Sequence, residues 1–339
     1  MLETRPLGRT KVAVTRIGFG GGPIGGHRGP VGDAQAEAAL QAAWDAGVRY
    51  FDTAPLYGIG NSERRLGRFL PGLPRDSFVL STKVGRLLRE PGADYRPHGL
   101  PGVPELQVVY DYSYDGALRS LEESFARLKL DRADIVLIHD IDRYTHGDRQ
   151  PEMAAAARDG AFRALRELRE QGVVGAIGLG QNEWDTAMAF ARDCDIDAVL
   201  LAGRYTLLEQ GAAQSFLPFC RERGIGIILG GPYNSGILAT GSASGAATYN
   251  YKPPPEPVRE RVARLEAVLQ RFAVELPAAA LQFPLHEPAV ATVIPGVGSV
   301  AEVQGTFRLL GQTVPVAAWD ALRDAGLIDP AASLPTGGR

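Results

Sequence analysis

The chain has 339 residues, of which 45% are hydrophobic and 22% charged, the composition of an ordinary globular protein. A net charge of −3 excludes a general attraction to nucleic acid or to an anionic membrane surface. The N-terminal stretch has no apolar core of signal-peptide length, and no segment approaches the roughly 18 apolar residues of a membrane-spanning helix. The two cysteines, Cys194 and Cys220, form no CxxC motif and are expected to be buried thiols in a cytoplasmic protein.

A short hairpin is predicted at the N-terminus, in residues 3–15, where RPLGRT supplies the turn. Beyond it, short apolar runs alternate with amphipathic stretches. The apolar runs are rich in β-branched residues and continuous, as expected for parallel strands that are buried on both faces. Eight such runs are predicted to be strands: 15–20, 48–53, 77–83, 133–139, 175–180, 197–202, 224–229 and 289–294.

Helices are predicted between these strands. Apolar residues fall on one helical face in 116–128 and in 258–272. The stretch 33–46 begins at Asp33, a suitable N-cap, and stops before Gly47. The alternation predicts an α/β fold, a closed (β/α)8 TIM barrel that forms one domain over residues 1–339, with the N-terminal β-hairpin plugging its bottom. An open doubly wound sheet is the alternative, because a count of strands does not prove closure.

Two segments, 84–114 and 230–257, are too long and too rich in proline and glycine to be simple connections. Both follow predicted strands, so in a barrel both are long mouth loops at the C-terminal end, where barrel active sites are built. We expect the second to fold over a ligand and its SASGAA tip to be mobile when no ligand is bound.

A GxGxxG pattern at Gly20, Gly22 and Gly25 follows the first predicted strand. The dinucleotide fingerprint also requires the third glycine to open a helix, whose N-terminus meets the pyrophosphate. Loop residues as far as Pro30 follow here, so a Rossmann site is not predicted. A mouth loop that lets a ligand approach closely is favoured over a merely flexible connection.

Three consecutive strands each end in a single titratable residue: Asp52, Lys83 and His139. In a barrel these ends converge on one mouth. A buried lysine needs a counter-charge, which Asp52 on the neighbouring strand supplies. Tyr57 follows closely, and a cation held against its phenol is expected to lower the pKa from about 10. The pattern predicts that Tyr57 is a general acid or base and that His139 orients a substrate oxygen.

A metal site is not predicted. His139 has acidic neighbours, but zinc requires several convergent nitrogen or sulfur ligands, and no second histidine lies at ligand spacing. The other histidines are scattered in predicted loops: His27, His98, His146 and His286. No GxSxG elbow occurs, so a Ser-His-Asp hydrolase is not predicted either.

These motifs resemble the aldo-keto reductase superfamily, almost from end to end. The stretch GVRYFDTAPLYGIGNSERRLG (47–67) is similar to its first signature, LSTKVG (80–85) carries its lysine, and DIVLIHD (134–140) carries its histidine. The resemblance implies a barrel that uses NAD or NADP without a Rossmann domain. It also implies that Tyr57 is the proton donor or acceptor, tuned by the lysine and the aspartate, with the histidine assisting substrate binding.

The cofactor positions match the family less closely. Asn182 takes the place of the asparagine that holds the nicotinamide carboxamide, but Gly180 and Gln181 replace the preceding serine. The usual glutamine three residues before Tyr205 is Ala202. The cofactor residues implied by the resemblance are Gly20, Asn182, Tyr205, Gly230 (in the place of the stacking tyrosine), Gly231, Pro232, Asn234, Ser235, Gly236, Pro295, Gly296, Gly298, Ser299 and Glu302.

The segment IPGVGS (294–299) resembles the one that grips the adenosine phosphate. Gly298 stands where NADP-binding relatives usually place an arginine. Because a 2′-phosphate needs basic donors, this favours NAD, with NADP as the alternative. Glu302 is expected to repel that phosphate or to accept from a ribose hydroxyl.

The phrases VVYDYSYDGALRSLEESFARLKLDRADIVLIHDID and LLAGRYTLLEQ resemble a narrower branch, the NAD-linked aldose 1-dehydrogenases of L-fucose and D-threo-aldoses, with pyridoxal 4-dehydrogenase as a relative. The implied reaction oxidises a cyclic hemiacetal to a lactone. Substrate contacts are predicted at Ile24, Tyr110 and Tyr112, although the tyrosines fit a packing role equally well. An NADPH-dependent carbonyl reductase and a cofactor-binding regulatory subunit are the alternatives, and a homo-oligomer is compatible with the sequence.

Overall fold

Eight parallel strands form one sheet in the order in which they follow along the chain. In this computed structural model, which describes residues 2–26 and 29–335, parallel bridges from Ile17 to Val293 and from Gly20 to Gly296 join the first strand region to the last. The sheet therefore closes into a barrel, and the open-sheet alternative is wrong. Its strands are β3 (Phe19–Gly20), β4 (Tyr50–Asp52), β5 (Val79–Val84), β8 (Ile135–His139), β9 (Ala176–Gln181), β10 (Ala198–Ala202), β11 (Gly226–Gly230) and β12 (Val290–Ile294).

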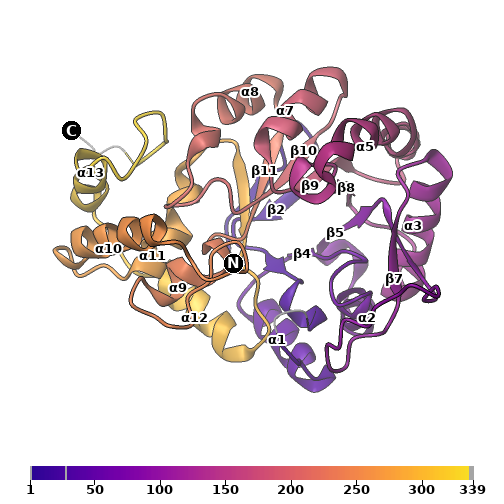
Figure 1. Cartoon of the computed structure of the whole chain (residues 1–339), viewed down its shortest axis with the longest axis horizontal. Coiled ribbons are helices and arrows are strands. Elements are labelled where there is room, and N and C mark those ends of the chain that lie inside the picture. The colour runs from indigo at the N-terminus through magenta and orange to yellow at the C-terminus, as the bar shows by residue number, and fades with distance from the viewer. Residues whose placement is uncertain (1, 27–28, 336–339) are drawn as a thin grey trace.

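Helices form a ring around the barrel (Figure 1). The longer ones are α1 (Asp33–Asp45), α2 (Asn61–Phe69), α3 (Tyr114–Leu128), α5 (Gln150–Ala156), α6 (Phe162–Glu170), α7 (Trp184–Asp193), α8 (Phe216–Arg223), α10 (Glu256–Gln270), α11 (Leu276–Gln282), α12 (Val300–Leu310) and α13 (Val316–Asp324). The short helices α4 (Arg143–His146) and α9 (Ile237–Thr240) lie in the connections. The three predicted helices are confirmed. The prediction of Asp33 as an N-cap is wrong, since Gly32 caps α1 and the Asp33 carboxylate pairs with Arg65 and Arg68 instead.

The N-terminal hairpin pairs β1 (Thr4–Pro6) with β2 (Ala13–Thr15). Leu7 and Val14 are fully buried and belong to the same hydrophobic cluster as Ile135 and Ala198, the first residues of β8 and β10. The hairpin thus covers the N-terminal end of the barrel, as predicted, and leaves the C-terminal end for the site.

Strand register decides which side chains enter the barrel. Tyr50 and Leu137 belong to the interior cluster, whereas Val136 packs in the cluster formed with the surrounding helices. Side chains two residues apart on a strand point to the same face. The register therefore directs Asp52 and His139, each two residues beyond an interior residue, into the barrel near its mouth.

Both long segments follow strands, β5 and β11, and so lie at the mouth as predicted. Residues 84–114 are not a structureless loop, because β6 (Arg86–Arg89) and β7 (Gln107–Tyr110) pair as an antiparallel ribbon. Residues 230–257 contain α9, and a backbone hydrogen bond of 3.0 Å from Ile237 to Thr248 ties this segment together.

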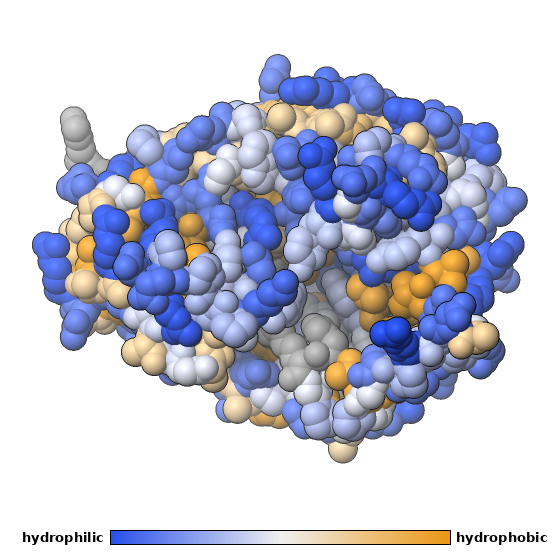
Figure 2. All heavy atoms as spheres, viewed as in Figure 1, coloured by the Kyte–Doolittle hydropathy of each residue, from blue (hydrophilic) through white to orange (hydrophobic). Residues whose placement is uncertain are grey.

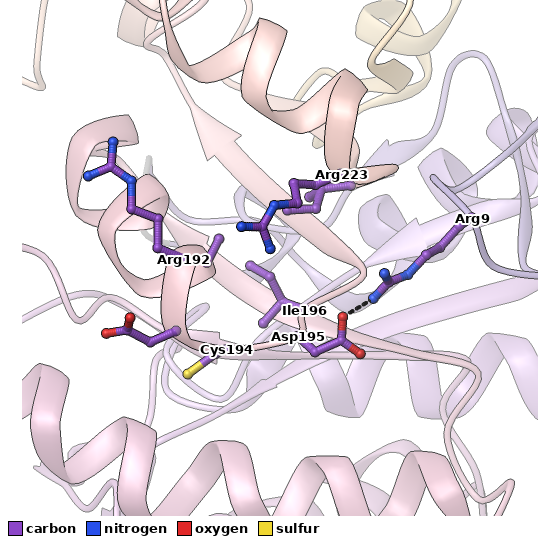
Figure 3. A pocket seen from close by; sticks show the side chains of 9 residues that line it. Arg9, Arg192, Cys194, Asp195, Ile196 and Arg223 are labelled. Atoms are coloured by element: carbon purple, nitrogen blue, oxygen red, sulfur yellow. Dashed lines mark hydrogen bonds and ion pairs between the residues drawn. The ribbon is translucent and has the colours of Figure 1, made fainter.

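A pocket of about 190 Å³ lies at the opposite end of the barrel, between the hairpin turn and the connections into β10 and β11 (Figure 3). It is smaller than usual ligand pockets of about 300–1,000 Å³. Arg9, at one side of it, is paired with Asp195. Cys194 is buried, and burial raises the pKa of its thiol to about 11, so it stays protonated. We assign no function to this end.

Two further properties concern the described residues as a whole. No helix in residues 2–26 and 29–335 is long and apolar enough to cross a membrane. No group of three or more histidine, cysteine, aspartate or glutamate side chains in the same ranges is arranged to hold a metal ion. His27 lies outside the described residues.

Replacing Leu7 with alanine tests the plug. The side chain is fully buried, so its truncation leaves a cavity and is expected to lower the free energy of unfolding by about 2–5 kcal/mol. Urea denaturation measures this change. The matched control is Val173→Ala, which truncates a side chain that is 40% exposed and should change stability by less than about 0.5 kcal/mol. Equal effects of the two substitutions would contradict the plug.

Candidate active site

An ion pair between Lys83 and Asp52 lies inside the barrel, at the mouth ends of β5 and β4. Both side chains are buried, and Lys83 Nζ donates to both carboxylate oxygens of Asp52 at 2.9 Å and to the carbonyl oxygen of Thr53 at 2.9 Å. Burial alone pulls the pKa of Lys83 down, but the charge of Asp52 and the phenol of Tyr57 outweigh it and leave the pKa above its usual value. The lysine therefore stays protonated.

Hydrogen bonds from neighbouring strands hold the carboxylate in place. Ser81 Oγ donates to Asp52 Oδ1 at 2.7 Å, and Ser81 Oγ lies 2.9 Å from the Tyr50 hydroxyl. Each of these side chains is on the inward-facing register of β4 or β5. The carboxylate thus has partners at both oxygens, which a buried charge requires.

Tyr57 lies above this ion pair, in the loop after β4. Lys83 Nζ is 4.7 Å from the centre of its ring. The expectation of a lowered pKa is wrong for the protein without a ligand. Burial of the phenol outweighs the attraction of Lys83 and, together with the nearby charge of Asp52, raises the pKa of Tyr57 to about 12. The tyrosine is therefore protonated at neutral pH and is an acid in its resting form.

His139 meets Tyr57 from the end of β8. The two rings lie edge to face, with their centres 6.0 Å apart. Burial, together with the positive charges of Arg86 and Lys83, holds the pKa of His139 well below its usual value, so the imidazole is neutral. The structure brings the four predicted residues together: a lysine–aspartate pair below, and a phenol and a neutral imidazole above.

Gly180 on β9 gives Lys83 the space to cross the barrel. A Cβ at this position would lie 3.0 Å from Lys83 Cε, closer than most side chains tolerate. A glycine at this position therefore avoids a close contact with the lysine side chain. Asn182 is the first residue after β9, whereas Gln181 ends the strand and is paired with Leu201, which packs in the outer cluster. Asn182 is therefore the better placed of the two for a ligand in the mouth.

The turn from β12 into α12 forms the other end of the candidate cofactor site. Glu302 Oε2 accepts a hydrogen bond of 2.7 Å from the Gly298 amide, and Ser299 caps α12 by accepting from the Glu302 amide. This is a variant of the capping box, in which the glutamate bonds to the amide of the residue before the N-cap rather than to the N-cap amide. A Cβ on Gly296 would lie 3.0 Å from Pro23, and one on Gly20 would lie 2.9 Å from the carbonyl oxygen of Pro295. Gly20 and Gly296 let two mouth loops approach closely. The GxGxxG pattern is not a dinucleotide fingerprint, because its third glycine, Gly25, does not open an α-helix; α1 begins only at Asp33.

Two residues that the sequence assigned to the cofactor lie elsewhere. Tyr205 is completely buried, with its ring 5.2 Å from that of Phe283, so it belongs to the core rather than to the mouth. Asn234 is buried and uses its side chain to tie two loops, since its amide donates to Gly203 and its oxygen accepts from Thr206. Gly230 ends β11 at the mouth, and Gly231, Pro232, Ser235 and Gly236 follow it; these five residues stay candidates.

The predicted substrate contacts are largely structural. Ile24 is completely buried in the cluster beneath α1, so it has a packing role in this structure and its contact with a substrate stays a prediction. Tyr112 is buried, and its hydroxyl donates to the backbone oxygens of His139 and Asp140 at 2.8 and 2.6 Å, which is the packing role. Only Tyr110 is substantially exposed, at 42%, beside Val109 on β7. Figure 2 shows a hydrophobic area on the otherwise mainly hydrophilic face, over the region of β7.

Two charged residues at the mouth were not predicted from the sequence. Arg86, the first residue of β6, forms a buried ion pair with Asp140, which follows His139. Arg86 also lies 5.0 Å from the centre of the Tyr110 ring. The signal was present in the sequence, since Asp140 directly follows a strand-end histidine, but its partner is far away in the chain.

A closed parallel barrel with a titratable cluster at its C-terminal mouth is a common enzyme architecture. The model of the aldo/keto reductase family matches residues 16–325, and the chain belongs to this family. It is therefore an oxidoreductase that works with a nicotinamide cofactor.

Two curated relatives match nearly the whole chain. It is 41% identical to pyridoxal 4-dehydrogenase from Microbacterium luteolum, over 96% of this chain and 98% of that protein. It is also 41% identical to D-threo-aldose 1-dehydrogenase from a Pseudomonas species, over 97% and 99%. Among solved structures, aldo-keto reductase AKR11C1 from Bacillus halodurans in its holo form superposes with a TM-score of 0.72 at 22% identity, covering 98% of both chains, which supports the fold.

Replacing Lys83 with methionine tests the ion pair. The substitution leaves the Asp52 carboxylate buried without its cation, so the free energy of unfolding is expected to fall by about 3–5 kcal/mol. The double variant Lys83→Met/Asp52→Asn removes the unpaired carboxylate charge and should regain most of that stability. Both the single and the double variant are expected to lack enzymatic turnover. Thermal and urea denaturation measure stability. Full stability of the single variant would contradict a charged pair.

Proposed function

We propose that Tyr57, Lys83, Asp52 and His139 carry out the reaction of this enzyme, with Tyr57 as the general acid or base. The observation that carries the proposal is the buried ammonium of Lys83, held by Asp52, at 4.7 Å from the ring of Tyr57. A fixed positive charge stabilises a phenolate, so Tyr57 can lose and regain its proton without leaving the site. Neutral His139 donates one hydrogen bond to a substrate oxygen.

The residues at the mouth fit a nicotinamide dinucleotide in two respects. Asn182, directly after β9, offers a side-chain amide, and the glycines after β11 and β12 let a ligand approach the backbone. The cofactor, when bound, supplies the hydride acceptor or donor. The protein supplies orientation and the proton.

The substrate that we propose is an aldose, oxidised at its cyclic hemiacetal to a lactone. Tyr57, as the phenolate, takes the proton of the anomeric hydroxyl while the hydride leaves the same carbon. A relative with 41% identity over 97% of the chain is a D-threo-aldose 1-dehydrogenase, which supports this class of substrate. The equally similar pyridoxal 4-dehydrogenase makes pyridoxal the second candidate, and the same four residues serve either oxidation. We expect the enzyme to act in the cytoplasm.

NAD is the cofactor that we propose over NADP. The site beside the adenosine end has glycine at 298, without a basic side chain, and the carboxylate of Glu302 lies against the amide of that glycine. A 2′-phosphate at this place would face a negative charge. A ribose hydroxyl, in contrast, can donate to a carboxylate.

A pH profile tests the role of Tyr57. Its pKa is raised from 10.0 to about 12, so the phenolate is the minor form below that pH, and its fraction rises tenfold per pH unit. The kcat/KM for oxidation should rise with a slope of one in log units from neutral pH towards the alkaline limit of stability. Tyr57→Phe should lower turnover by at least about 10²-fold while the binding of NAD, measured by fluorescence, is kept. A flat profile, or an active phenylalanine variant, would exclude Tyr57 as the base.

A substrate panel tests the proposed class. L-fucose, D-arabinose and other aldoses are each offered with NAD, and NADH formation is followed by absorbance. Aldoses should be oxidised and pyridoxal should be poor. Turnover of pyridoxal alone would select the second candidate, and absence of turnover with every compound, at full NAD binding, would favour a regulatory role.

The variant Glu302→Gln tests the cofactor preference. A glutamine oxygen still accepts from the Gly298 amide, so the cap is retained while the charge is lost. Removing a repulsion of about 1 kcal/mol should raise kcat/KM with NADP about fivefold and leave that with NAD nearly unchanged. Equal changes with both cofactors would show that Glu302 does not face the 2′ position.

A further inference from the structure

The residue after His139 leaves the strand in an unusual way. Asp140 has a φ of 47°, in the left-handed region that non-glycine residues rarely occupy. In a continuing strand its side chain would point away from that of His139. The turn instead brings Asp140 Oδ2 to 3.4 Å from His139 Nε2.

This turn is held from several sides. The Asp140 amide donates to Gly180 at 2.9 Å, and its carbonyl oxygen accepts from the Tyr112 hydroxyl at 2.6 Å. His146 Nε2 lies 2.9 Å from the same oxygen. Because these bonds come from β9, from the segment before α3 and from α4, the contact between Asp140 and His139 is built into the mouth.

The Asp140 carboxylate has a dedicated counter-charge. Arg86 forms an ion pair with Asp140 Oδ2, and both side chains are almost completely buried. The titratable groups that face Asp140 from the surrounding elements are Arg86, His139, Asp142, Lys83, Tyr57, Tyr112 and His146. Burial, with the nearby charge of Asp142, raises the pKa of Asp140 to about 6 against the pull of Arg86.

A neutral imidazole carries one ring proton, on either nitrogen. Nδ1 of His139 is buried and has no hydrogen-bond partner within residues 2–26 and 29–335. A buried N–H without a partner is rarer and costlier than an unpaired acceptor. A carboxylate, which only accepts, sits beside Nε2. Both observations favour the proton on Nε2, and a ligand in the mouth cannot reach the buried Nδ1.

We propose that Asp140 is a positioning residue that keeps the ring proton of His139 on Nε2, ready for the substrate oxygen, and that Arg86 keeps the Asp140 carboxylate ionised. This role rests on the proposed function of His139. At 3.4 Å the contact is longer than a normal hydrogen bond, so it orients the N–H without occupying it fully.

Nuclear magnetic resonance tests the proposal without turnover. The full chain, labelled with ¹⁵N-histidine, is compared with its Asp140→Asn variant in long-range ¹H–¹⁵N spectra, and His139 is assigned with His139→Gln. The wild type should show His139 as the Nε2–H tautomer at pH 8. In Asp140→Asn the amide can donate to Nε2, so a mixture or the Nδ1–H tautomer is expected. An Nδ1–H tautomer in the wild type would overturn the proposal, whatever the activity.

Kinetics give the second readout. As the pH falls through about 6, Asp140 takes up a proton and no longer only accepts, so its effect on His139 is lost. Below that pH the slope of log kcat/KM for oxidation should steepen from one to two in the wild type and stay at one in Asp140→Asn. Above it, the variant should be about 10- to 100-fold slower, mainly in kcat.

Matched controls separate positioning from stability. Glu63→Gln alters another buried carboxylate–arginine pair, between Glu63 on α2 and Arg127 on α3 at 2.6 Å, in which neither side chain forms a hydrogen bond or an ion pair with His139. It should leave the tautomer and the pH slope unchanged. In Asp140→Asn, Arg86 is left buried without its counter-charge, which lowers stability. The double variant Arg86→Met/Asp140→Asn removes this unpaired charge, so it should restore stability but not the Nε2–H tautomer of His139. An unchanged tautomer and pH slope in this double variant would reduce Asp140 to a structural ion pair.

Discussion

The buried ion pair of Lys83 and Asp52 is the constraint on which the rest of the site depends. An ammonium group inside a barrel is tolerable only if its donors are satisfied, and here Asp52 and the carbonyl of Thr53 satisfy them. The pair requires adjacent strands in matching register. It also requires space opposite, which the absence of a side chain at Gly180 provides. The requirements of packing and of charge therefore fall on the same residues, Lys83, Asp52 and Gly180.

Burial, rather than the nearest charge, sets the resting protonation of the groups above that pair. The lysine was expected to make Tyr57 acidic, but desolvation of the phenolate is the larger effect and its pKa rises to about 12. The same desolvation keeps His139 neutral. The resting site thus holds a protonated phenol and a neutral imidazole, which suits reduction directly and makes oxidation dependent on alkaline pH.

The mouth loops serve mainly as supports. Tyr112 and Asn234, which the sequence placed next to ligands, use their polar groups on backbone atoms of neighbouring segments. A site of this kind needs side chains held in one orientation, and such anchoring provides it. The Arg86–Asp140 ion pair is a further anchor at the mouth, and its carboxylate lies 3.4 Å from His139 Nε2.

The sequence by itself determined the eight strands, the α/β class and the four residues at the centre of the site, because apolar runs and strand-end polar residues are local patterns; it favoured a barrel without proving that the sheet closes. It also identified the family. Tertiary structure alone decided that the barrel closes, through contacts such as Gly20 with Gly296. It alone decided that Tyr205 and Ile24 are core residues, since burial depends on what packs against a side chain. The pairing of Arg86 with Asp140, and the raised pKa of Tyr57, were likewise beyond the sequence, because both arise from groups that are distant in the chain and adjacent only in the folded barrel.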